Sequence, residues 1–141
     1  MSWIILGLLS AVFASLVAIF GKMGLTSLDS TFATAVRSVI MAVFMIIFSL
    51  SLGKLSWPAL SALGGKEWLI LGAAGIAGAL SWLAYFAALK LGPATSVAAL
   101  DRLSIVFVVV FAILALGERF TWEKALGAVL VALGAFLITL K

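Results

Sequence analysis

Five long apolar runs, each almost free of charge, dominate this sequence and restrict what it can fold into. They cover residues 3–20, 31–52, 68–89, 94–116 and 125–140. Each run is close to the roughly 20 residues that an α-helix needs to cross the hydrocarbon core of a bilayer. Helices satisfy their backbone hydrogen bonds within one segment, as lipid requires. The sequence therefore predicts an all-α membrane protein, a bundle of five transmembrane helices.

The composition agrees with a lipid environment and argues against several classes of soluble protein. Hydrophobic residues make up 66% of the 141 residues and charged residues 10%, whereas a soluble domain is roughly 45–50% apolar and about 25% charged. The chain has no histidine and no cysteine, which excludes a disulfide framework, thiol-ligated zinc and histidine-based catalysis. No carboxylates cluster and no nucleophile stands beside a base, so we expect neither an enzyme nor a cofactor or metal. The basic residues are scattered singly, so no nucleic-acid partner is expected.

The connectors between the runs are short, apart from residues 53–67. In that segment Ser56 is a typical N-cap and Pro58 suits the first turn of a helix. These residues predict a short helix over residues 58–63, lying in the membrane interface between the second and third spans and ended by two glycines. The first apolar run has no basic residue before it and is too long for the core of a signal peptide, so we expect it to be a span. Nothing divides residues 1–141, which we expect to form one transmembrane domain.

The basic residues divide almost evenly between the two faces of the membrane. The face that holds the N-terminus carries four of them: Lys54, Lys66, Arg119 and Lys124. The opposite face carries Lys22, Lys90 and Lys141, with Arg37 and Arg102 inside spans near it. A membrane protein of fixed orientation normally shows a clear excess on its cytoplasmic side. Two interpretations stay open: the small number of loops hides the bias, or the chain inserts both ways up and two copies meet head to tail.

The fifth run carries small residues and leucines at helical spacing. Gly127, Leu130, Gly134 and Leu137 share one face of the predicted helix. Small residues at such positions let helices approach closely in lipid, where close packing drives association. This face either packs inside the bundle or forms the interface of a dimer.

Three charged residues lie inside the spans: Arg37, Asp101 and Arg102. Each falls six or seven residues from the same membrane face, or about 9–11 Å below it at the rise of an α-helix. The third span brings Trp82 and Tyr85 to the same half of the bilayer. Charges at this depth are costly and usually mark a substrate site, a water-filled path or an ion pair. We therefore predict that these five residues bind substrate in a cavity.

The alternative is structural: Arg37 pairs with Asp101, and Arg102 extends to the headgroups. Asp101 is the one carboxylate inside a span, and the positive charge of the next residue, Arg102, favours its charged form. The sequence therefore gives little support to a proton-coupled mechanism.

Several segments together resemble a known family. Residues 96–104 (SVAALDRLS), 117–118 (GE), 122–127 (WEKALG) and 85–94 (YFAALKLGPA), with Arg37 early in the second span, are similar to one EamA-type repeat of the drug/metabolite transporter superfamily. The segment LDRLS resembles the short, five-span bacterial and archaeal branch. The likeness covers essentially the whole chain and is specific as a combined pattern.

The resemblance implies a transporter in the cytoplasmic (inner) membrane of a bacterium or archaeon. Full-length relatives carry two repeats in opposite orientation with substrate between them. A single repeat is expected to pair, so we predict a homodimer, antiparallel in orientation, that exports small polar metabolites or drug-like solutes by alternating access. Small multidrug-resistance relatives carry a glutamate in the first helix, but residues 10–20 here have no charge, which argues against proton-coupled cation export. The rival function is a non-transporting membrane subunit or regulator that pairs with another small membrane protein.

Overall fold

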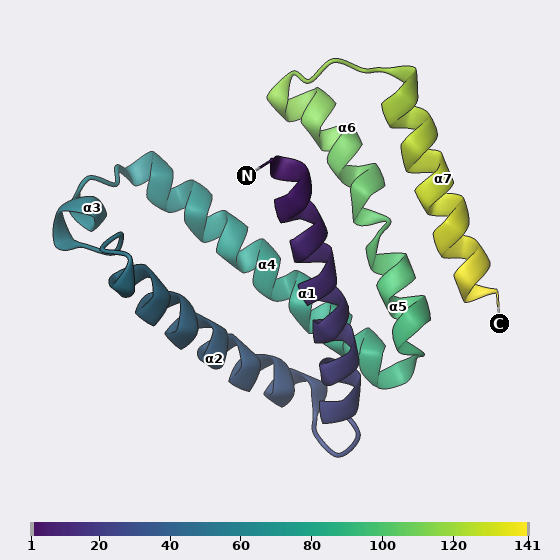
Figure 1. Ribbon diagram of the computed structural model, residues 1–141, viewed down its shortest axis with the longest axis horizontal. Coiled ribbons are helices and arrows are strands. Elements are labelled where there is room, and N and C mark those ends of the chain that lie inside the picture. Colours follow the sequence, from purple (N-terminus) through teal and green to yellow (C-terminus); the bar gives the residue numbers. More distant parts are fainter. Residues whose placement is uncertain (1, 141) are drawn as a thin grey trace. The chain divides into compact units, whose positions relative to one another are not determined.

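The computed structural model describes residues 2–140 and confirms an all-α membrane protein (Figure 1). Lys141, one of the counted basic residues, lies outside the described residues. Five segments are long and apolar enough to cross a membrane. The described helices are α1 (Trp3–Gly24), α2 (Ser30–Ser51), α3 (Trp57–Ser61), α4 (Gly65–Leu91), α5 (Ala94–Asp101), α6 (Ser104–Leu116) and α7 (Trp122–Thr139).

The chain divides into two compact units. Unit one contains α1, α5, α6 and α7, and unit two, residues 24–90, contains α2, α3 and α4. Buried side chains in unit one come mainly from alanines, whereas unit two buries Leu25, Thr34, Phe86 and Leu89. Each unit is described by itself below.

Several helix boundaries differ from the sequence prediction: α1 extends to Gly24 instead of residue 20, and α7 begins at Trp122 instead of residue 125. The third span, α4, begins at Gly65 rather than at residue 68, so the second of the two glycines expected to end the short helix is the first residue of α4. The short helix α3 is present but ends at Ser61. Its N-cap is Ser56, whose hydroxyl accepts a hydrogen bond from the amide of Ala59 at 3.4 Å, and Pro58 occupies its first turn as predicted.

The fourth span runs from Ala94 to Leu116 as predicted, but it consists of two helices. Between α5 and α6 the backbone tightens: the Arg102 amide donates to the Ala99 carbonyl at 3.1 Å, and the Leu103 amide donates to the Leu100 carbonyl at 3.0 Å. These bonds join residues three apart, as in a 3₁₀ turn, which often marks a hinge or a functional site within a helix. Asp101 ends α5, and aspartate side chains compete with the helical backbone by forming hydrogen bonds to nearby backbone groups.

In unit one, α7 packs against both α5 and α6 (Figure 1). Ala128 and Ala135 of α7 are 7% and 4% exposed, and Ala112 of α6 is also buried. Small side chains allow the backbones to approach, which is the main source of helix association in lipid. The Ser96 hydroxyl of α5 donates to the Ile138 carbonyl of α7 at 3.4 Å.

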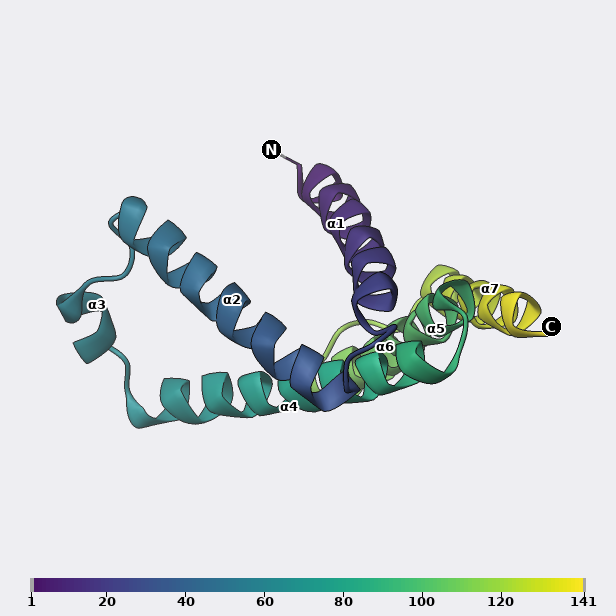
Figure 2. The ribbon, with the colours of Figure 1, turned by 90° about the horizontal axis from the view of Figure 1, so that it is seen from below.

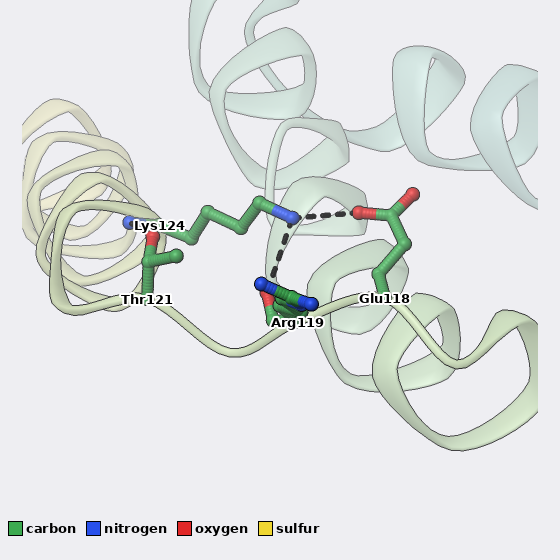
Figure 3. Close-up of polar contacts among 4 residues, drawn as sticks. All are labelled: Glu118, Arg119, Thr121 and Lys124. Atoms are coloured by element: carbon green, nitrogen blue, oxygen red, sulfur yellow. Dashed lines mark hydrogen bonds and ion pairs between the residues drawn. The ribbon is translucent and has the colours of Figure 1, made fainter.

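The connection from α6 to α7 is a tight loop held by one lysine (Figure 3). Gly117 ends α6 with φ of 68°, a left-handed conformation that glycine adopts without strain. The Thr121 hydroxyl accepts from the Lys124 amide at 3.3 Å and caps α7. The Lys124 ammonium donates to the Glu118 carboxylate at 2.7 Å and to the Arg119 carbonyl at 3.3 Å. Since the Lys124–Glu118 pair is exposed, it orients the loop and adds little stability.

In unit two, α2 and α4 converge at one end and separate toward α3 (Figures 1 and 2). The meeting end contains the start of α2 and the end of α4. There the Lys90 ammonium donates to the Leu25 carbonyl at 3.1 Å and also to the Leu28 carbonyl, which closes the loop before α2. Leu25 and Leu89 are 3% and 0% exposed, so this end is the best-packed part of the unit.

Asp29 caps the start of α2 next to this lysine. Its carboxylate accepts from the amides of Thr31 at 2.9 Å and Phe32 at 3.0 Å. The Phe32 amide, followed by the Thr31 amide and the charge of Lys90, holds the pKa of the Asp29 carboxyl below its ordinary value. Because the carboxyl has a lower pKa in the folded protein than in the unfolded chain, its charged form stabilises the fold at pH values above the unfolded-chain pKa. This contribution is lost as the pH falls through the folded-state pKa.

We expect Asp29→Ala to lower the midpoint of thermal unfolding in detergent at pH 7, and Asp29→Asn to keep most of the stability, because asparagine caps helices as well as aspartate does. The advantage of the native protein over Asp29→Asn is expected to shrink once the pH falls below the ordinary aspartate value of 3.8. Equal midpoints for the alanine and asparagine variants at pH 7 would contradict this role.

Candidate functional site

The most distinctive polar contact inside the spans is the stack of Arg37 on Trp82. Arg37 lies on α2 and Trp82 on α4, both in unit two. The guanidinium carbon lies 3.7 Å from the centroid of the Trp82 ring and 5.5 Å from that of Phe86. A cation this close to an aromatic face is attracted by the ring, most strongly where water is excluded. The two helices are therefore joined by a charged side chain within the predicted membrane region.

Three aromatic side chains of α4 form a cluster around this stack. Trp82 and Phe86 are four residues apart and lie on one face of the helix, with ring centroids 5.9 Å apart. Tyr85 meets the edge of Trp82 at 5.6 Å and lies 6.2 Å from Phe86. The structure thus places the predicted residues Arg37, Trp82 and Tyr85 in one cluster. Sequence reasoning missed Phe86, which its four-residue spacing from Trp82 could have revealed.

One nitrogen of Arg37 is buried without a hydrogen-bond partner among the described residues, namely Nη1. The nearby hydroxyls on α2 do not help as donors to a ligand: Thr34 donates to the Ser30 carbonyl at 2.7 Å, and Ser38 donates to the Thr34 carbonyl at 2.8 Å. A buried donor without an acceptor is costly, and more so for a charged group. The site therefore favours an acceptor that comes from outside unit two.

Asp101 and Arg102 lie at the break between α5 and α6, in unit one. In an uninterrupted α-helix the Arg102 amide would bond to Ala98, but here it bonds to Ala99. The Ala98 carbonyl therefore lacks its helical donor. Such backbone is tolerated at membrane depth where it faces protein or a water-filled cavity. The predicted Arg37–Asp101 ion pair stays a prediction.

The α7 face predicted as a dimer interface is uncovered within its unit. It comprises Gly127, Leu130, Gly134 and Leu137. The two leucines are 59% and 67% exposed, and a Cβ added at either glycine would meet no heavy atom of the described residues within 4 Å. The alanine face described above packs against α5 and α6 instead. The glycines are thus not used for close packing inside unit one.

The described part of the chain offers no group of three or more acidic, histidine or cysteine residues that could hold a metal ion. Within unit two, the arrangement offers a guanidinium with a buried, unpartnered nitrogen beside an aromatic surface.

We expect the α5–α6 break to face water or protein rather than lipid, because its backbone is not fully bonded within the helix. Since the native sequence has no cysteine, a single Ser104→Cys variant can be tested in intact membranes without background. It should react with a charged, water-soluble thiosulfonate reagent, whereas Val108→Cys, one turn further along α6 and 62% exposed, should not. If Ser104→Cys does not react, water does not reach the break.

Comparison with known proteins agrees with the resemblance seen in the sequence. Residues 1–140 match the EamA-like transporter family. A protein from Sinorhizobium sp., named "Uncharacterized transporter in cobO 3'region", is 44% identical over 137 residues, which is 97% of this chain and 96% of that protein. No solved structure matches the chain significantly. The chain is therefore a five-span membrane protein that belongs to the EamA-like transporter family.

Proposed function

We propose that this protein exports small polar metabolites or drug-like solutes across the cytoplasmic membrane. The observation that carries the proposal is the unpartnered Nη1 of Arg37, held on the face of Trp82 inside a span. A charged group kept at such cost within the bilayer usually serves a ligand. The substrate-binding residues we propose are Arg37, Trp82, Tyr85, Asp101 and Arg102.

The interrupted fourth span supports transport by alternating access. Discontinuous helices in transporters expose backbone groups near the middle of the membrane, where substrate is bound. The break between α5 and α6 frees the Ala98 carbonyl and carries Asp101 and Arg102 beside it. Substrate binding at this turn would supply hydrogen bonds that the helix lacks.

We further propose that two copies pair through α7, in opposite orientations. The face of Gly127, Leu130, Gly134 and Leu137 is free within unit one, and its glycines permit close approach of a second helix. The nearly even division of basic residues between the membrane faces is what a chain that inserts both ways up would show. Substrate would then bind between the two copies.

Transport by the purified protein in lipid vesicles is expected to depend on the charges inside the spans. Over a panel of radiolabelled amino acids, organic acids, sugars and amines, Arg37→Ala and Asp101→Asn should each reduce flux by about tenfold or more, as loss of a charge-assisted bond does. Arg119→Ala, which removes an exposed charge from the α6–α7 loop, is the matched control. If both span variants assemble and transport as the native protein does, these residues have only a structural role.

Leu130→Cys is expected to form disulfide-linked dimers when membranes are treated with a mild oxidant. Val129→Cys is the matched control, because it is 53% exposed but lies about 100° away around the helix. For paired copies of opposite orientation, a C-terminal tag should be accessible from both sides of the membrane; one-sided accessibility would exclude them. A cross-linked product whose mass differs from that of a homodimer would favour the rival function, a subunit that pairs with another membrane protein.

A further inference from the structure

The charges inside the spans do not balance, and this imbalance identifies a class of substrate. Away from the helix ends, the five spans contain Arg37, Asp101 and Arg102 and no other charged residue. If Asp101 neutralises one arginine, one positive charge remains in each chain. An uncompensated charge in a low-dielectric environment attracts a mobile counter-ion strongly. The membrane region therefore favours one negative charge supplied from outside the chain.

Arg37 is the arginine that this negative charge would satisfy. Arg102 directly follows Asp101 in the chain, at the same break. Unit two, by contrast, contains only two acidic residues, Asp29 and Glu67. Asp29 lies outside α2 and accepts two amide hydrogen bonds as its cap, and Glu67 is in the first turn of α4, at the opposite end from Trp82. Neither is within a span near Arg37, so unit two provides it with no countercharge.

The shape of the site favours a carboxylate. One face of the guanidinium lies on Trp82, which leaves its edge, with the unpartnered Nη1, to donate hydrogen bonds. The planar fork of a guanidinium matches the two oxygens of a carboxylate. The Thr34 and Ser38 hydroxyl protons are already used within α2, so neither hydroxyl offers a further donor to a doubly charged phosphate.

The aromatic cluster beside the guanidinium suits an apolar group attached to that carboxylate. We propose that Arg37 binds the carboxylate of a monoanionic organic substrate, whose apolar part lies against Trp82, Tyr85 and Phe86. This inference rests on the proposed transport function and names the chemical class that the site would take.

Binding can be measured through the fluorescence of Trp82. The variant used has Trp82 as its single tryptophan. The four other tryptophans, which are all exposed, are replaced by phenylalanine: Trp3, Trp57, Trp68 and Trp122. The variant is reconstituted in vesicles of zwitterionic phosphatidylcholine, which lack anionic headgroups, and titrated at constant ionic strength. The probes are sodium butyrate, its neutral isostere butyramide, sodium phosphate and sodium chloride.

We expect butyrate to change the Trp82 emission saturably and butyramide, phosphate and chloride to have little effect. Arg37→Gln should weaken butyrate binding by about tenfold or more, and Arg37→Lys should also weaken it, because an ammonium has no planar fork. Arg119→Gln, which removes an exposed arginine, should not alter it.

An equal response to butyrate and butyramide, or unchanged butyrate binding in Arg37→Gln, would overturn the inference. Tighter binding of phosphate than of butyrate would also overturn it, as would a response only when phosphatidylglycerol is added to the vesicles, which would identify a lipid headgroup as the anion. Arg37-dependent flux of neutral or cationic solutes without butyrate binding would refute the carboxylate site while leaving the transport function intact. Butyrate binding without flux of any solute would support the site and refute transport.

Discussion

The structure depends on one constraint: inside a bilayer no solvent is available to satisfy a polar group. Several hydroxyl side chains in the spans are satisfied by their own helix. The hydroxyls of Ser15, Thr34, Ser38 and Thr139 each donate to a backbone carbonyl three or four residues earlier. Among the described residues, the nitrogen Nη1 of Arg37 is an exception, because it is buried without a hydrogen-bond partner. Against a background in which polar groups are satisfied locally, an unsatisfied charged group indicates where the protein meets a ligand.

The same constraint explains why so much of the fold could be read from the sequence. Span length, the absence of charge, and the capping residues Ser56, Pro58 and Gly117 all reflect local rules, and the structure follows them. The depth of Arg37, Trp82 and Tyr85 within their spans also follows from counting along the chain. Counting placed these residues in the same half of the bilayer, and the structure shows them in contact.

What the sequence did not reveal depends on contacts between helices or on weak local signals. The break after Asp101 involves neither glycine nor proline, so no strong helix breaker marks it. On α7, the alanine pair and the glycine pair are spaced identically and lie on adjoining faces. Only the packing shows that Ala128 and Ala135 are used within unit one and that the glycines are not. Phe86 was missed because an aromatic residue in an apolar span carries no polar signal of its own.

The packing of α7 against both halves of the fourth span has a mechanical consequence. Because α7 contacts both α5 and α6, it supports the span on both sides of their break. Its buried residues are Ala128 and Ala135, and the Ser96 hydroxyl of α5 adds a hydrogen bond to the Ile138 carbonyl. Bending of the span at Arg102 would break contacts with α7 on one side of the break or the other. The fourth span can therefore leave backbone groups unbonded at its interruption while α7 holds its two halves together.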